Sequence, residues 1–100
     1  MTIQPSYTPD EARALLPLVR STILQLASLR RKPDVPVGEL RALLDFLESH
    51  GIVLRDVETG LVDFPTVRDG EPAWLCWRLE DPDLGYWHTT REGYASRRPL

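Results

Sequence analysis

Residues 60–78 read GLVDFPTVRDGEPAWLCWR, and this stretch decides the fold. At its centre stands Asp69-Gly70, a strong signal for a two-residue β-hairpin turn, because these residue types tolerate the positive φ angles that such a turn requires. The flanking residues are rich in β-branched and aromatic side chains, which favour strands. The stretch therefore predicts an antiparallel hairpin with strands over 61–68 and 71–79.

The register of this hairpin sorts its side chains onto two faces, since successive residues of a strand point to opposite sides of a sheet. One face is predicted to be the core side, covered by helices, and carries Val62, Phe64, Ala73, Leu75, Trp77 and Leu79. The other face is too apolar for open water and is expected to be a dimer or ligand face. It carries Leu61, Asp63, Pro65, Val67, Trp74, Cys76 and Arg78. The predicted homodimer uses Leu61, Val67, Trp74 and Cys76.

Two more strands are predicted on either side of this hairpin. Residues 52–57 precede it, with a turn over 58–60, and residues 84–89 follow it after a turn over 80–83. Residues 90–100 look irregular. The second half of the chain, 51–100, is therefore predicted to be a four-stranded antiparallel meander with a C-terminal tail.

The first half, residues 8–50, predicts an antiparallel helical hairpin. Thr8-Pro9-Asp10-Glu11 has the residues of a capping box with proline at the first helical position. Pro17 interrupts the helical pattern, and we expect it to kink the helix without ending it. A second helix is expected from about Val37 to Ser49, ahead of a C-cap at Gly51. The apolar stripes are Ala12, Leu16, Val19, Ile23 and Leu26 on the first helix, and Leu40, Leu43, Leu44 and Leu47 on the second. Together the two halves predict one α+β domain over 1–100, with the helical hairpin packed on the sheet.

Composition restricts the partners of this chain. Its 100 residues are 42% hydrophobic and 27% charged, which is ordinary for one globular domain. A core of this size is modest, and dimerisation would enlarge it. The net charge of −3 argues against nucleic acid as a partner, since nucleic-acid binding relies on a basic face. No apolar stretch is long enough to span a bilayer, so no membrane association is expected.

A cytoplasmic location is expected from the single cysteine and from the first residues. Cys76 has no second cysteine with which to form an internal disulfide, which fits a reducing compartment. The segment from Met1 to Ser6 has neither the basic start nor the apolar run of a signal peptide.

Several motifs together resemble a bacterial domain-of-unknown-function family, numbered 2203. They are Gly51, Arg55-Asp56, Gly60 to Pro65, Asp69-Gly70, Leu75 to Arg78, Trp87-His88 and the tail Arg97 to Leu100, and the opening Tyr7 to Pro17 looks like the family's first helix. The chain departs from the family pattern at Glu80-Asp81, where the family has Gly-Glu, and at Arg98, where it has Gln. The resemblance implies a small, dimeric, cytosolic bacterial protein and implies no activity.

His88 is the sharpest single candidate for chemistry. It could ligate a metal ion, with oxygen ligands from Asp63, Asp81 or Glu92. The expected register places His88 on the face of Leu75, opposite Asp63, and a slip of one residue in the 80–83 turn would reverse this. Two other roles stay open for His88: a structural histidine bonded to the tail or to a carboxylate, and general acid–base chemistry.

Cys76 is expected to be a small buried apolar residue. A nucleophilic cysteine needs a base beside it, and the register places Asp63 there instead. The negative charge of a carboxylate discourages formation of a thiolate.

Charges alternate in sign along neighbouring strands. They form either cross-strand ion pairs or an anion pocket in which Arg55 or Arg78 holds a carboxylate or phosphate between tryptophans. The candidate binding residues are Arg55, Asp56, Asp63, Arg78, Trp87 and His88.

The sequence thus predicts a homodimeric binding or interaction module without catalysis and without a cofactor. The alternative is a small metal-dependent enzyme or metal-binding protein centred on His88, with a divalent metal ion as cofactor.

Overall fold

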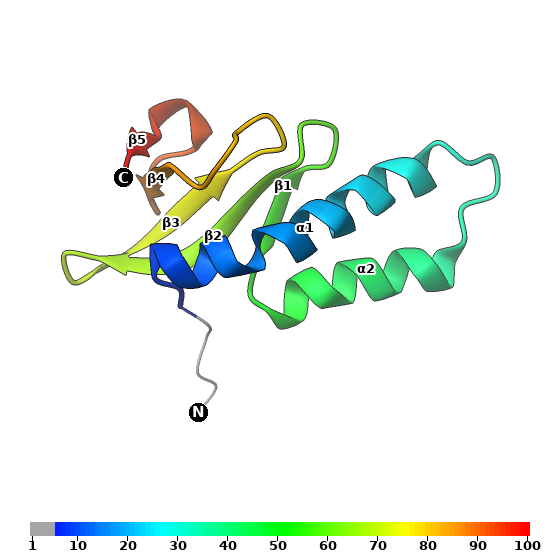
Figure 1. Cartoon of the computed structure of the whole chain (residues 1–100), viewed down its shortest axis with the longest axis horizontal. Coiled ribbons are helices and arrows are strands. Elements are labelled where there is room, and N and C mark those ends of the chain that lie inside the picture. Colours follow the sequence, from blue (N-terminus) through cyan, green and yellow to red (C-terminus); the bar gives the residue numbers. More distant parts are fainter. Residues whose placement is uncertain (1–5) are drawn as a thin grey trace.

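A computed structural model describes residues 6–100 and shows two helices followed by an antiparallel sheet of five strands (Figure 1). The sheet order is β1-β2-β3-β4-β5, so each strand pairs with its neighbour in the chain. The α+β prediction is confirmed. The elements are α1 (Pro9–Arg30), α2 (Val37–Ser49), β1 (Val53–Asp56), β2 (Leu61–Arg68), β3 (Glu71–Trp77), β4 (Tyr86–Thr89), the 3-10 helix η1 (Tyr94–Ser96) and β5 (Arg98–Pro99).

The fifth strand corrects the prediction of a four-stranded meander with an irregular tail. β5 pairs with β4, with Arg98 opposite Trp87 and Pro99 opposite Tyr86. Beyond it, the amide of Leu100 donates to the carbonyl of Gly85 at 2.9 Å. A two-residue strand that contains proline has no periodic pattern of its own, and proline is tolerated at such an edge. β5 therefore exists because of its tertiary contacts.

Helix α1 begins as the sequence predicts. The Thr8 hydroxyl accepts from the amide of Glu11 at 3.2 Å, and the Glu11 carboxylate accepts from the amide of Thr8 at 2.9 Å. The helix then continues through Pro17 to Arg30 without a break. Within the described part of the chain, neither helix is long and apolar enough to cross a membrane.

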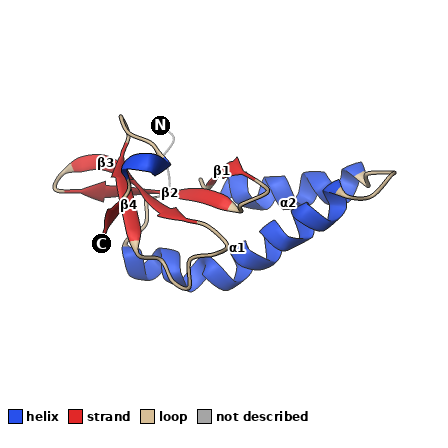
Figure 2. Cartoon of the chain, turned by 90° about the horizontal axis from the view of Figure 1, so that it is seen from above, coloured by secondary structure: helices blue, strands red, loops and turns tan. Residues whose placement is uncertain are grey.

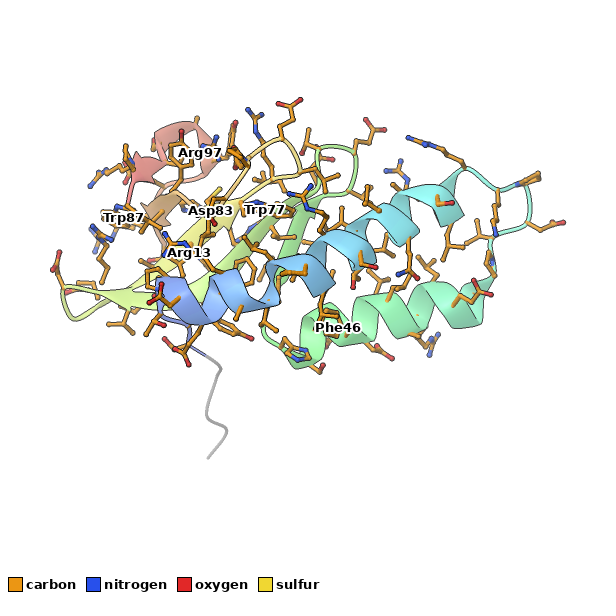
Figure 3. All side chains as sticks on the ribbon, in the orientation of Figure 1. Arg13, Phe46, Trp77, Asp83, Trp87 and Arg97 are labelled. Carbon is orange, nitrogen blue, oxygen red and sulfur yellow. The ribbon has the colours of Figure 1, made fainter. Side chains whose placement is uncertain are left out.

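The two helices run side by side in opposite directions, and α1 lies against one face of the sheet (Figures 1 and 2). On α2 the prediction is wrong for Leu44, whose side chain is 41% exposed, and Phe46 packs against the core instead (Figure 3). Arg13 of α1 also reaches the loop after β3, where it donates to the carbonyl of Leu84 at 3.0 Å (Figure 3). The core residues that join helices and sheet include Val19, Ile23, Leu26, Val62, Phe64, Leu75 and Trp77.

The central hairpin has the predicted turn and register. Asp69 and Gly70 have φ angles of 52° and 79°, as a two-residue turn of this kind requires. Phe64 pairs with Leu75, so the apolar face of the hairpin is buried under α1.

The register of β4 corrects the prediction for His88. His88 pairs with Trp74, and Trp87 pairs with Leu75. His88 therefore lies on the face of Asp63, and Trp87 lies on the core side. The connection from β3 to β4 spans residues 78–85, and a link of this length does not fix a register as a two-residue turn does.

Candidate functional site

A β-bulge in β1 places the first side chain of the site. Leu54 pairs with Val62 and Asp56 pairs with Leu61, which leaves Arg55 without a partner on β2. Bulges of this kind redirect a side chain and occur often beside functional sites. Here the bulge brings Nε of Arg55 within 2.9 Å of Oδ2 of Asp63.

Asp63 lies at the centre of the site. Its side chain is only 3% exposed, and a buried carboxylate requires compensating partners. Beside the Arg55 bond, Nε2 of His88 lies 3.1 Å from each of its two oxygens. The Asp63 carboxylate is therefore held between a guanidinium and an imidazole.

The other nitrogen of His88 defines the proton arrangement of the ring. Nδ1 lies 2.9 Å from the carbonyl oxygen of Thr89, which can only accept a hydrogen bond, so Nδ1 carries a proton. Nε2 faces the two Asp63 oxygens at hydrogen-bond distance, and a metal ion bound there would replace this contact. This arrangement is the usual one for a metal-ligating histidine, whose free N–H is held by a carbonyl.

Cys76 completes a cluster of three buried donor groups. It pairs with Asp63 across the β2–β3 ladder and is fully buried. The sulfur of Cys76, one oxygen of Asp63 and one ring nitrogen of His88 all lie within 4.8 Å of one another. Burial, together with the negative charge of Asp63, raises the pKa of the Cys76 thiol to about 12. At neutral pH this thiol is protonated, as the neighbouring carboxylate led us to expect.

A cavity of about 360 Å³ opens beside this cluster. Asp63 and His88 form part of its wall, and the rings of Trp74 and Tyr94 form another part. Arg55 stacks over Trp74, with 5.1 Å from Cζ to the ring centroid. The remaining lining residues are Leu61, Thr90, Glu92 and Gly93.

The C-terminal segment folds over the same face of the sheet. Arg97 donates to both oxygens of Asp81, at 2.8 and 3.3 Å. Its guanidinium lies over Tyr86 at 3.8 Å and over Tyr94 at 4.6 Å, and Figure 3 shows Arg97 on this segment beside the sheet. Burial alone would raise the pKa of Asp81, but the bond from Arg97 and the one from the Arg78 amide lower it further than burial raises it. This salt bridge holds the tail against the face that the sequence predicts to be a dimer or ligand face.

The structure brings together only some of the predicted site residues. Arg55, Asp63 and His88 meet, and Glu92 lies at the cavity with its carboxylate bonded to the Thr89 hydroxyl and to Arg98, both at 3.1 Å. Asp81 is separate from this group, because it belongs to the Arg97 salt bridge.

The other three predicted residues have local roles. Asp56 accepts from the Thr59 hydroxyl at 2.9 Å and from the Glu58 amide, and these bonds lower its pKa. The guanidinium of Arg78 lies over the Tyr94 ring, and its Nε is 3.8 Å from Oδ1 of Asp81. Trp87 lies on the other face of the sheet, between Arg68 and Arg98.

Sequence reasoning placed Trp74 on the dimer or ligand face, but it treated Cys76 as a buried apolar residue and not as a donor, and it missed Tyr94. The predicted hairpin register already pairs Asp63 with Cys76. Adding His88 to that pair required the correct register of β4, and Tyr94 required the fold of the tail.

Comparison with known proteins gives one family. A sequence model of the family described as "Uncharacterized conserved protein (DUF2203)" matches residues 34–100. No curated protein and no solved structure matches the chain.

Proposed function

Because the chain belongs to the DUF2203 family, which is described only as uncharacterized, we propose a function from the site itself: the protein binds a divalent transition-metal ion through Asp63, Cys76 and His88. Zinc is the expected ion. The observation that carries the proposal is the convergence of these three buried side chains, whose donor atoms lie within 4.8 Å of one another.

The chemistry of the three donors suits zinc. Zinc accepts sulfur, imidazole nitrogen and carboxylate oxygen, commonly in a tetrahedral arrangement. Two nitrogen or oxygen ligands of a tetrahedral zinc stand roughly 3.3 Å apart, given bonds of about 2.0–2.1 Å. Nε2 of His88 and the oxygens of Asp63 are already 3.1 Å apart. These two side chains need only a small adjustment to share an ion.

The neighbouring residues support this use of the cluster. The Thr89 carbonyl holds the Nδ1 proton of His88 and leaves Nε2 for the metal. Arg55 bonds Oδ2 of Asp63 and leaves Oδ1 for the metal. Three protein ligands would leave a tetrahedral ion one ligand short, and the cavity lies beside them.

Binding also has costs. The metal must displace the proton of Cys76, whose pKa is raised to about 12. It must also share the Asp63 carboxylate with Arg55. We therefore expect the affinity to be lower than that of an all-thiolate structural zinc site.

The test is the metal content of the full chain, purified without chelator and dialysed against zinc. We expect one equivalent of metal in the wild type and none in His88→Gln. His50→Gln is the matched control, since His50 is the other histidine and bonds the Phe46 carbonyl at the end of α2. Cobalt-loaded wild type should show the absorption of a thiolate–cobalt bond, and Cys76→Ser should lose it. No bound metal, together with no rise in melting temperature on adding zinc, manganese or nickel, would reject the proposal.

A homodimer remains a second proposal. Val67 is 60% exposed, and Leu61 and Trp74 are only partly buried, so an apolar part of the predicted dimer face is accessible. Cys76 is fully buried and so cannot contact a second copy directly. A chain that sediments as a monomer at micromolar concentration would exclude this dimer. Bacterial origin and a cytoplasmic location likewise stay predictions from the sequence.

A further inference from the structure

We propose that the cavity beside Asp63 and His88 binds a small carboxylate ligand with a flat apolar body, and that Arg55 holds its carboxylate. The proposal concerns an organic ligand and not the metal ion. It rests on the cavity and on Arg55, and it does not require the metal to be present.

The cavity has the size and the walls for such a ligand. Its volume of about 360 Å³ lies within the range of small-molecule sites, roughly 300–1,000 Å³. Trp74 contributes a ring from β3 and Tyr94 contributes a ring from the tail. Leu61 adds an apolar side chain from β2. A flat apolar body fits among these three side chains better than a fully hydrated ion does.

Arg55 provides the charged end of the site. Its Nε is committed to Asp63, and its Nη1 and Nη2 make no hydrogen bond within residues 6–100. The bond from Nε to Asp63 and the position over Trp74 place the guanidinium at the wall of the cavity. The two free NH2 groups of the planar guanidinium match the two oxygens of a carboxylate.

The charged groups around the cavity leave Arg55 as the place for an anion. The Asp63 carboxylate bonds Arg55 and lies within hydrogen-bond distance of His88, and the Glu92 carboxylate bonds Arg98 and the Thr89 hydroxyl. Nη1 and Nη2 of Arg55 are thus charged donors without a hydrogen-bond partner among residues 6–100. A metal ion on Asp63 and His88 would add positive charge and strengthen the binding of an anion, and the two affinities would be coupled reciprocally.

The probe is benzoate, with inorganic phosphate as the second ligand. Titration of the wild type should move the indole N–H signal of Trp74 in a nitrogen–proton correlation spectrum. The signals of Trp77 and Trp87 should stay in place, since Trp77 is fully buried and Trp87 lies on the other face. This measurement needs no variant of the binding residue. Phosphate that binds more tightly than benzoate, or signals of all three tryptophans that move alike, would overturn the proposal.

Variants of arginine test the contact itself. Arg55→Gln should weaken benzoate binding by at least about tenfold, as expected for the loss of a charge-assisted pair. Arg68→Gln is the control, because Arg68 stacks over Trp87 at 4.5 Å in the same manner but outside the cavity. Equal affinities for the two variants would contradict the role of Arg55.

Both titrations are run on chelator-treated and on zinc-loaded protein. Benzoate binding without any zinc binding would leave this proposal standing and reject the metal function. Zinc binding without benzoate binding, in both the chelator-treated and the zinc-loaded protein, would reject this proposal and leave the metal function standing.

Discussion

Nε2 of His88 lies 3.1 Å from both carboxylate oxygens of Asp63, although 25 residues separate them in the chain. They stand on β4 and β2, with Cys76 on the strand between them. This contact forms only when β2, β3 and β4 pair in the correct register. The pair therefore links the register of the whole sheet to the site.

The first prediction concerns removal of the charge at the centre of this network. Asp63→Asn should lower the free energy of unfolding by about 2–3 kcal/mol, because Arg55 and the buried His88 lose their common acceptor. Urea unfolding at pH 7 measures the loss. Asp56→Asn is the control, since Asp56 is exposed and bonds only its own turn, and its loss should be smaller. Equal losses of unfolding free energy in the two variants would show that the buried Asp63 network stabilises the fold no more than the exposed Asp56 turn does.

The second prediction concerns two glycines that share a backbone conformation but have different surroundings. Gly60 and Gly70 both have positive φ, at 69° and 79°. A methyl group on Gly60 would overlap Leu79 and stand 3.0 Å from Cγ2 of Ile23, whereas nothing lies within 4 Å of one on Gly70. Gly60→Ala should therefore lose about 1–3 kcal/mol more than Gly70→Ala, the excess being the cost of overpacking. Denaturant unfolding of the two variants gives the difference, and similar losses would contradict this steric account.

The fold was predictable where a local signal fixes geometry. The Asp69-Gly70 turn leaves no freedom of register, so the pairing of Phe64 with Leu75 followed from the sequence. The capping box of α1 is likewise local. β5 was not predictable, because two residues carry no period and their pairing depends on β4 already being in place.

The site was only partly predictable for the same reason. His88 was recognised as a candidate, but its face depended on the connection over 78–85. In that connection the Asp81 carboxylate accepts from the Arg78 amide, and its carbonyl accepts from the Trp77 indole at 3.2 Å. The β-bulge that aims Arg55 at Asp63 has no sequence signal here. Such contacts depend on the assembled sheet, so no local sequence pattern predicts them.

The third prediction is a dependence of stability on pH through Asp81. Its folded pKa is lowered below 3.8, so the stability it contributes is present above that value and is lost as the pH falls through the folded pKa. Asp81→Asn should therefore cost about 1–3 kcal/mol at pH 7 and progressively less as the pH falls below 3.8. Unfolding curves at pH 7 and below pH 3.8 test this. Asp10→Asn is the control: its side chain is 95% exposed, so the change should be close to zero throughout, and an Asp81→Asn loss that persists unchanged in acid would refute the account.

The fourth prediction concerns access to Cys76. The thiol is fully buried and its pKa is raised to about 12, so it should react with a disulfide reagent at pH 8 far more slowly than the unfolded chain does. Arg97 holds the tail over this face through Asp81 and Tyr86. Arg97→Ala should raise the rate by about tenfold or more, because losing roughly 1.4 kcal/mol of local stability increases the open population tenfold.

The matched control for this variant is Arg98→Ala. Arg98 is the next residue on the same segment, but its guanidinium lies over Trp87 and bonds Glu92, and it is not part of the salt bridge to Asp81. Its removal should leave the thiol protected, since the Arg97–Asp81 salt bridge remains. If both variants accelerate the reaction equally, the tail opens as one unit, and the Arg97–Asp81 salt bridge is not the contact that holds it closed. If neither does, the reagent reaches Cys76 by global unfolding, and the rate should then follow the unfolding equilibrium in low concentrations of urea.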